Sequence, residues 1–253
     1  MSSRLFLKRC RAVAAGRGDV GVVLLDGDHV IADALAAGVV LEGLVTDGRH
    51  PDLTRQLEAR GCPIFLVTDE EMAAASPVRT SSGVVALAQW SPASVSDVLA
   101  ATPAVVIGLV GVQDPGNVGG IIRSAEALGA TGVLALDETA DPGGWKALRG
   151  AMGSTFRLAV GRGRTTDLFS TAGRLGIPVA ATVPVGGTDP GRDNLAPPVI
   201  VLFGGEGPGL TDDIVARCDR RVTIPMKPGA NSLNVGVSAA LILWEANKAS
   251  PRP

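Results

Sequence analysis

The chain has 253 residues, 46% of them hydrophobic and 19% charged, with a net charge of −2. These values exclude a disordered chain, argue against a general nucleic-acid binder and leave room for two globular domains. Cys10, Cys62 and Cys218 are widely spaced and the two histidines lack metal-ligand spacing, so we expect a reduced, cytoplasmic protein without metal or disulfides. No signal peptide or membrane-length apolar run is visible, so we expect no membrane partner.

Positive charge gathers in two parts of the chain. The first group lies ahead of the first acidic residue and consists of Arg4, Lys8, Arg9, Arg11 and Arg17. The second group consists of Lys146, Arg149, Arg157, Arg162 and Arg164. Both groups are suited to contact phosphate, although a solvated helix face is the simpler interpretation from charge alone.

Alternating strand and helix patterns predict a compact α/β layer domain in the N-terminal part. Apolar runs predict strands at residues 20–25, 39–45, 63–67 and 84–88. Helical spacing predicts helices at residues 29–37, 52–60 and 69–75, followed by a turn-rich loop at 76–83. Because residues 91–103 are small, polar and proline-containing, we place a linker there and expect domains at 1–97 and 98–253.

The alternation restarts after this linker. Apolar runs predict strands of a parallel sheet at residues 105–112, 133–136, 179–183 and 199–203. Residues 118–129 predict a helix whose apolar positions share one face, with Arg123 roughly opposite. A second helix, at 235–244, is apolar nearly all round, so we expect it to be buried, in part by another subunit.

Three loops in this second domain combine glycines with polar side chains. They carry Asn117 and Arg123, then Glu206 among four glycines, then Ser232 and Asn234. Taken singly, these residues fit helix caps, a surface arginine and a solvated turn. Together at strand ends they predict a small-molecule pocket, and the absence of a Gly-x-Gly-x-x-Gly or Gly-x-x-x-x-Gly-Lys motif argues against a dinucleotide fingerprint or a phosphate-binding loop.

The same segments carry a resemblance to a known family. DPGNVGGIIRSAEALGA (114–130), VLFGGEGPGL (201–210) and IPMKPGANSLNVGVSAAL (224–241) resemble motifs 1, 2 and 3 of the SpoU-type (TrmH-like) RNA ribose 2′-O-methyltransferases of the SPOUT superfamily. Residues 22–39 and 75–88 are similar to the ribosomal-protein-like RNA-binding domain that precedes this catalytic domain. In this N-terminal part the chain has Asp26 where the family usually has Glu, and in motif 3 it has Gly236 where Ser or Ala is usual.

The resemblance implies an α/β fold whose parallel sheet ends in a C-terminal trefoil knot, with S-adenosylmethionine bound in the knot and a homodimer around the active sites. It implies catalytic roles for Asn117, Arg123, Glu206, Ser232 and Asn234. It implies cofactor contacts at Gly204, Gly205, Gly207, Ile224, Met226 and Leu233. We expect RNA contacts in the N-terminal domain at Arg4, Lys8, Arg9, Arg11 and Arg79.

The implied reaction is attack of a ribose 2′-hydroxyl on the methyl group of the cofactor, without metal. We assign Arg123 to phosphate contact and activation of the hydroxyl, because a guanidinium is a poor base, and leave the proton acceptor open. Asn117, Ser232 and Asn234 would orient the ribose and loop, and Glu206 would organise its own loop. Ribosomal RNA is favoured as substrate over transfer RNA. The alternatives are a non-catalytic RNA-binding protein of the same fold and a nicotinamide-dependent oxidoreductase.

Overall fold

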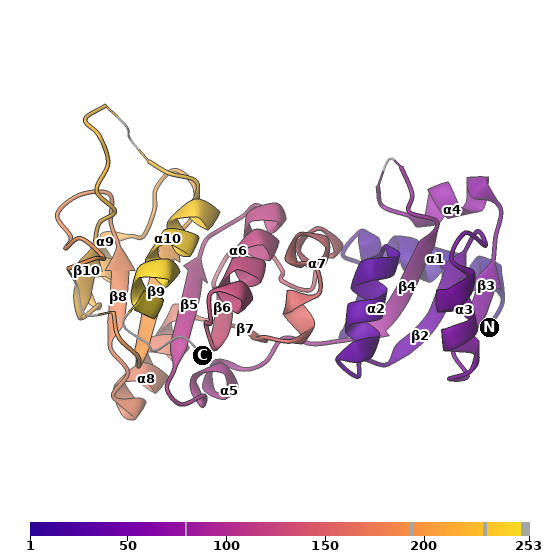
Figure 1. Cartoon of the computed structure of the whole chain (residues 1–253), viewed down its shortest axis with the longest axis horizontal. Helices are drawn as coiled ribbons and strands as arrows, with labels where there is room; N and C mark the ends of the chain where they lie inside the picture. The colour runs from indigo at the N-terminus through magenta and orange to yellow at the C-terminus, as the bar shows by residue number, and fades with distance from the viewer. Residues whose placement is uncertain (79, 193–194, 230–231, 249–253) are drawn as a thin grey trace. The chain divides into compact units, whose positions relative to one another are not determined.

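The computed structural model in Figure 1 describes residues 1–78, 80–192, 195–229 and 232–248. The chain forms two compact units. The N-terminal unit consists of Met1–Ser91 together with Gly143–Phe156, and the C-terminal unit consists of Pro92–Pro142 together with the described part of Arg157–Pro253. The division differs from a single cut after residue 97, because a later segment of the chain returns to the first unit.

The N-terminal unit is built on a four-stranded sheet in the order β1-β4-β2-β3. Its strands are β1 (Val22–Asp26), β2 (Leu41–Thr46), β3 (Ile64–Leu66) and β4 (Val84–Gln89). The central strand β4 runs antiparallel to both β1 and β2, whereas β2 and β3 are parallel. All four strands coincide with the apolar runs of the sequence, which confirms the predicted α/β layer arrangement for this unit.

Side chains alternate along each strand, so both faces of this sheet are apolar, and helices cover both. On one face, α2 (Asp28–Ala36) and α3 (Pro51–Glu58) pack against Leu25 and Leu44. On the other face, α1 (Ser3–Ala14) and α4 (Asp69–Ala75) pack against Leu24, Val45 and Leu87. Phe6 of α1 is completely buried and stacks on Phe65, with ring centroids 4.6 Å apart. The two faces therefore have separate hydrophobic cores.

Residues 143–156 complete the N-terminal unit from far along the sequence. They form α7 (Trp145–Ala151) and the short 3₁₀ helix η1 (Ser154–Phe156). Leu148 of α7 is buried in the core that contains α2, and Trp145 packs against the core on the opposite face. Gly153 has a φ of +80°, and a Cβ there would lie 2.1 Å from Oδ2 of Asp33, so only glycine fits this close approach to α2.

The C-terminal unit contains a six-stranded, fully parallel sheet in the order β10-β8-β9-β5-β6-β7. Its strands are β5 (Val105–Val110), β6 (Gly132–Leu136), β7 (Ala159–Gly163), β8 (Val179–Thr182), β9 (Val199–Gly204) and β10 (Arg220–Val222). The structure confirms the predicted parallel sheet and its strands β5, β6, β8 and β9. The edge strands β7 and β10 are not predicted from the sequence. Both edge strands are short or polar and lack a continuous apolar run.

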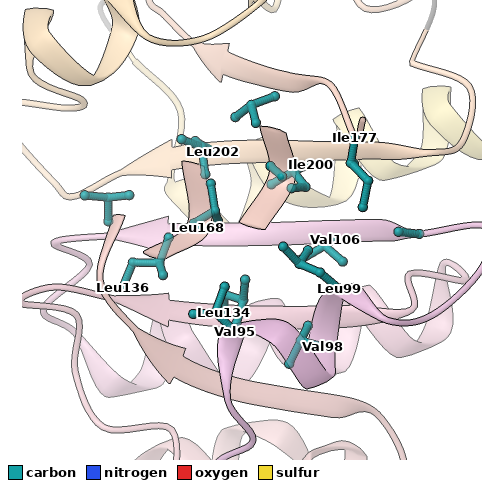
Figure 2. Close-up of a cluster of buried hydrophobic side chains, with 14 residues drawn as sticks. Val95, Val98, Leu99, Val106, Leu134, Leu136, Leu168, Ile177, Ile200 and Leu202 are labelled. Carbon is teal, nitrogen blue, oxygen red and sulfur yellow. The ribbon is translucent and has the colours of Figure 1, made fainter. Parts of the chain in front are cut away.

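Helices also cover both faces of this second sheet. Figure 2 shows the core on one face, where Val106, Leu134 and Ile200 of the central strands pack against α5 (Val95–Leu99) and α8 (Thr165–Leu175). On the opposite face, α6 (Pro115–Ala127) packs against β6, and α10 (Val235–Lys248) packs against α6 and β9. The short helix α9 (Asp212–Ala216) precedes β10. Among the described residues, no helix has both the length and the apolarity needed to cross a membrane.

The predicted linker at residues 91–103 is wrong in its central part. Those residues form α5, whose first turn is closed by reciprocal hydrogen bonds between Ser94 and Asp97. Val98 and Leu99 of this helix are buried in the core shown in Figure 2. The polar residues that suggested a linker are therefore the capping residues and outer face of a short core helix.

The predicted burial of the C-terminal helix holds for one face only. Ala239, Ile242 and Leu243 of α10 are buried, in agreement with the prediction. Val237, Leu241 and Trp244 are 49%, 42% and 44% exposed, and their spacing places them on one side of the helix. An apolar stripe therefore remains open on the single chain.

We predict that Leu148→Ala lowers the free energy of unfolding of the N-terminal unit by about 2–4 kcal/mol, because it leaves a cavity in that core. Hydrogen exchange should report faster opening of amides in β1 and β4 and unchanged protection in β5. The exposed neighbour Arg149→Ala is the matched control and should have little effect. Equal loss of protection in both units would contradict the assignment of this segment.

Candidate active site

The first loop of the site lies between β5 and α6. Asp114 caps the helix, because its Oδ1 accepts a hydrogen bond of 2.8 Å from the backbone N–H of Gly116, and Pro115 occupies the first helical position. The capping role that the sequence allowed for Asn117 therefore belongs to Asp114. Asn117 lies within the first turns of the helix with its side-chain amide available for other partners.

The second loop, Gly204 to Gly209, follows the central strand β9 and folds tightly on itself. The backbone N–H of Gly209 donates to the carbonyl of Gly205 at 3.2 Å. A Cβ on Gly205 would lie only 2.0 Å from the carbonyl oxygen of Gly111, in the first loop. Gly207 has a φ of +100°, which L side chains rarely adopt. These glycines bring the two loops together and place Glu206 on the exposed tip.

One hydrogen-bonded chain links all three predicted motifs. The side-chain N–H of Asn117 donates to Oε1 of Glu206, and its Oδ1 accepts a bond of 3.0 Å from Nδ2 of Asn234. Oδ1 of Asn234 in turn accepts from the backbone N–H groups of Gly236 and Val237, at 2.8 and 3.3 Å. We call these three side chains the Asn–Glu–Asn network. Residues that are 89 and 117 positions apart in sequence thus meet at one point.

The chemistry of the partners fixes the orientation of each amide in this network. An ionised carboxylate only accepts hydrogen bonds, so the NH₂ group of Asn117 must face Glu206. The helix N-terminus presents only N–H donors, so the oxygen of Asn234 must face the start of α10. The remaining NH₂ group of Asn234 and the remaining oxygen of Asn117 then pair with each other. Neither amide can flip without losing bonds at both ends.

Two predicted catalytic residues lie outside this network. Arg123 follows Asn117 by six residues on α6, which corresponds to about 9 Å along the helix axis. Its side chain is exposed and makes no hydrogen bond or ion pair with the residues that the structure describes. Ser232 is also exposed, before the start of α10. The structure thus joins Asn117, Glu206 and Asn234 and leaves Arg123 and Ser232 open to solvent.

The residues predicted to contact the cofactor lie on three segments. Gly204 and Gly205 are half-buried at the end of β9, whereas Gly207 is exposed. Ile224 and Met226, which follow β10, are half-buried, and Leu233 is 41% exposed. Exposed glycine backbone and partly open apolar side chains suit a ligand with both polar and apolar parts. No cluster of metal-ligating side chains occurs in the described part of the chain.

The basic residues predicted to contact RNA have different environments. Arg4 and Lys8 are exposed, and within the described ranges neither makes an ion pair. Arg9 is half-buried and pairs with Asp19 and Glu42 at 3.0 and 2.8 Å; the hydrogen bond to Asp19 is the main reason that its pKa is raised. Arg11 donates from Nε to the carbonyl of Ala74 at 2.8 Å. Arg79 lies outside the described residues.

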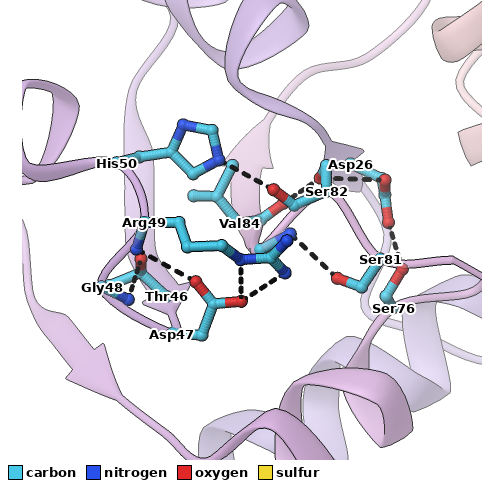
Figure 3. A network of polar contacts seen from close by, with 11 residues as sticks. Asp26, Thr46, Asp47, Gly48, Arg49, His50, Ser76, Ser81, Ser82 and Val84 are labelled. Atoms are coloured by element: carbon cyan, nitrogen blue, oxygen red, sulfur yellow. Dashed lines mark hydrogen bonds and ion pairs between the residues drawn. The ribbon is translucent and has the colours of Figure 1, made fainter.

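Figure 3 shows a polar network that sequence reasoning did not foresee, at the two ends of the loop that contains residue 79. Asp26 is 7% exposed and accepts hydrogen bonds from Ser76 at 2.6 Å and from Ser82 at 3.5 Å. His50 hydrogen-bonds through Nε2 to the carbonyl of Ser82 at 2.8 Å. The carboxylate of Asp26 therefore holds both ends of this loop.

An ion pair lies beside this network. The guanidinium of Arg49 hydrogen-bonds to the carboxylate of Asp47, with Nε to Oδ2 at 2.8 Å, and this bond lowers the pKa of Asp47. A Cβ on Gly83, whose φ is +87°, would lie 2.8 Å from both Asp47 and Arg49. Glycine is therefore required where the loop rejoins β4.

Comparison with known proteins gives consistent results over nearly the whole chain. The chain is 32% identical over 240 residues to an uncharacterized tRNA/rRNA methyltransferase of Synechocystis sp., and the match covers 92% of this chain and 86% of that protein. It is 28% identical over 229 residues to the 23S rRNA (guanosine(2553)-2′-O)-methyltransferase of Bacillus subtilis, covering 90% and 89%. The crystal structure of an S-adenosylmethionine-bound rRNA methyltransferase from Sinorhizobium meliloti superposes with a TM-score of 0.88 and 26% identity, covering 100% and 97%.

The model of the SpoU rRNA methylase family matches residues 104–244, which include every motif of the site described above. The match spans more than half of the chain and includes all three members of the Asn–Glu–Asn network. The chain belongs to the SpoU rRNA methylase family.

Proposed function

We propose that this protein transfers a methyl group from S-adenosylmethionine to a ribose 2′-hydroxyl of ribosomal RNA. The observation that carries the proposal is the Asn–Glu–Asn network, which brings the polar residues of three separate motifs to one point at the carboxyl edge of a parallel sheet. This edge is where open α/β sheets bind their ligands. Transfer RNA is the alternative substrate, since one relative named above carries both RNA classes in its name.

The segments around the network fit S-adenosylmethionine. The backbone of Gly204, Gly205 and Gly207 would contact the polar parts of the cofactor, and Ile224, Met226 and Leu233 would contact its apolar surface. When bound, this cofactor supplies an electrophilic methyl group. The fit rests on the exposed glycine backbone of the second loop and on the partly open side chains after β10.

The remaining chemistry belongs to the side chains. The Asn–Glu–Asn network fixes the two loops relative to each other, so that a bound ribose meets a preorganised site, and such positioning supplies a large part of the rate of a transfer reaction. Arg123 is exposed and has no hydrogen-bond or ion-pair partner among the described residues, so its planar guanidinium is available to contact an RNA phosphate and to activate the neighbouring hydroxyl. Ser232 would contact the ribose from the start of motif 3.

We further propose that the protein works as a homodimer whose interface includes α10 and that the C-terminal segment of the sheet threads a trefoil knot. The exposed stripe of Val237, Leu241 and Trp244 supports the first proposal, because three apolar side chains on one helix face gain stability when a partner covers them. The packing of α10 across both α6 and β9 is consistent with the second. The N-terminal unit would bind the RNA substrate.

We predict that the purified protein transfers labelled methyl from S-adenosylmethionine to 23S rRNA and that Arg123→Ala lowers this rate by at least about 10²-fold. The stability of the variant should change by less than about 1 kcal/mol, because the side chain is exposed. Arg123→Lys should not restore the rate, because an ammonium group lacks the planar fork of donors. Mapping 2′-O-methyl groups in the product RNA then locates the modified nucleotide.

Arg174→Ala removes an exposed arginine on α8, away from the three motifs, and serves as the control. Near-normal turnover in both Arg123 variants would assign Arg123 a peripheral role. Methyl transfer to transfer RNA alone would show that transfer RNA, and not ribosomal RNA, is the substrate. No transfer to either RNA, with binding of a nicotinamide cofactor instead, would overturn the proposed function.

A second prediction concerns the cofactor loop. Gly205→Ala should weaken S-adenosylmethionine binding by at least about tenfold, because its methyl group would displace Gly111 and separate the two loops. Gly173→Ala is the matched control, since no described residue outside its own stretch of helix lies within 4 Å of a Cβ at that position. Isothermal titration calorimetry measures both affinities. An unchanged affinity in Gly205→Ala would show that cofactor binding does not depend on this contact.

A third prediction concerns the exposed stripe on α10. Sedimentation of the protein at micromolar concentration should give about twice the chain mass of 25.7 kDa. Leu241→Glu should shift the protein toward the monomer, because it places a charge in the apolar interface. Leu175→Glu, which changes an exposed leucine on α8, should leave the dimer intact. A wild-type monomer that still methylates RNA would refute the proposed assembly.

A further inference from the structure

A small hollow lies in the N-terminal unit, whereas the site described above belongs to the C-terminal unit. Its volume is about 300 Å³. It is lined by the end of α1, the end of α4, the start of the following loop and the first residue of α7, namely Arg11, Ala14, Ala15, Ala74, Ala75, Ser76, Pro77 and Trp145. Most of these side chains are small, so the walls leave an arginine and an indole ring as the two large groups in the hollow.

Arg11 is held in place on one side of this hollow. Its Nε donates a hydrogen bond of 2.8 Å to the carbonyl of Ala74, which lies in the adjacent wall. Its two terminal nitrogens have no partner within the described part of the chain, so their N–H groups are free to donate. An arginine fixed at Nε with a free outer edge is a suitable group for a phosphate.

Trp145 supplies the other large group. It is half-buried, and the Nζ of Lys146 lies 5.5 Å from the centre of its ring, which is within the range of a cation–π contact. Aromatic residues make up only 3% of the chain and tyrosine is absent. A half-covered indole with one cation near its ring and a second cation lining the same hollow is therefore a rare combination in this protein.

One residue that lines the hollow, Ser76, belongs to the network shown in Figure 3. Ser76, which lines the hollow, donates to the buried carboxylate of Asp26 at 2.6 Å. This bond fixes the backbone between α4 and the loop. Since the lining segments are all held by packing or hydrogen bonds, the hollow needs little rearrangement to accept a ligand, and a preformed site loses less entropy on binding.

We infer that this hollow binds one unpaired nucleotide of the RNA substrate, with its base stacked on Trp145 and its phosphate held by Arg11 and Lys146. The inference rests on the proposed function, because it names a subsite for the same RNA. Every base has a flat π face, so stacking on an indole does not require a particular sequence. The two cations supply the backbone contact that stacking alone lacks.

The test measures binding of a labelled single-stranded RNA of about twelve nucleotides to the full-length protein. Fluorescence anisotropy of the RNA gives the affinity, and quenching of tryptophan fluorescence reports stacking on the ring. Trp145→Leu keeps an apolar side chain in the core but removes the ring, and should weaken binding on the order of tenfold and abolish most of the quenching. Arg11→Gln and Lys146→Gln should weaken binding and flatten its dependence on salt.

Arg60→Gln is the matched control, because Arg60 is an exposed arginine of the same unit that does not line the hollow. An RNA backbone of the same length without bases should bind wild type and Trp145→Leu equally. Wild-type affinity and quenching in a correctly folded Trp145→Leu protein would overturn the inference. S-adenosylmethionine binding and methyl transfer, measured on the same preparations, show separately whether the proposed function fails.

Discussion

The close approach of Gly205 to the carbonyl of Gly111 is the contact on which the rest of the site depends. Because no side chain separates the two backbones, the loop after β9 lies directly against the loop after β5. That contact brings Glu206 within hydrogen-bonding distance of Asn117, and Asn117 in turn meets Asn234 at the start of α10. Each amide in the Asn–Glu–Asn network has one suitable orientation, so the geometry of the three loops is determined together.

This arrangement separates the residues that build the site from those that remain open for substrate. Asn117, Glu206 and Asn234 satisfy one another, whereas Arg123 and Ser232 are exposed and unbonded to the described chain. A site with a rigid internal framework and free outer groups suits a reaction that depends on alignment of a large substrate. The same separation occurs in the N-terminal unit, where Arg9 forms internal ion pairs and the outer nitrogens of Arg11 have no partner among the described residues.

The sequence predicts the parts of the fold that have strong periodicity. The four strands of the first sheet, the four most apolar strands of the second and the helices α2, α3, α4, α6 and α10 follow from apolar runs and spacing. The helix α5 could not be predicted, because its five residues are too few for a helical period and its capping residues, Ser94 and Asp97, are also typical of linkers. Nor could the position of α7, since the strand β1 against which it packs is more than a hundred residues away and contacts at that range have no local pattern. The motif residues of the site could be identified from the sequence. Their hydrogen bonds could not, because Asn117 and Asp114 are both suitable helix caps and only the structure shows that Asp114 caps α6.

The return of residues 143–156 to the N-terminal unit has a consequence for the modularity of the gene. The chain passes between the two units at 91/92, 142/143 and 156/157, so the N-terminal unit is not one continuous stretch of sequence. Deleting or exchanging only the first ninety or so residues would strip Leu148 and Trp145 of their partners and leave an apolar helix uncovered. A recombination event that moves the N-terminal unit between members of the family must therefore carry both segments, or replace the apolar Leu148 and Trp145 with polar residues.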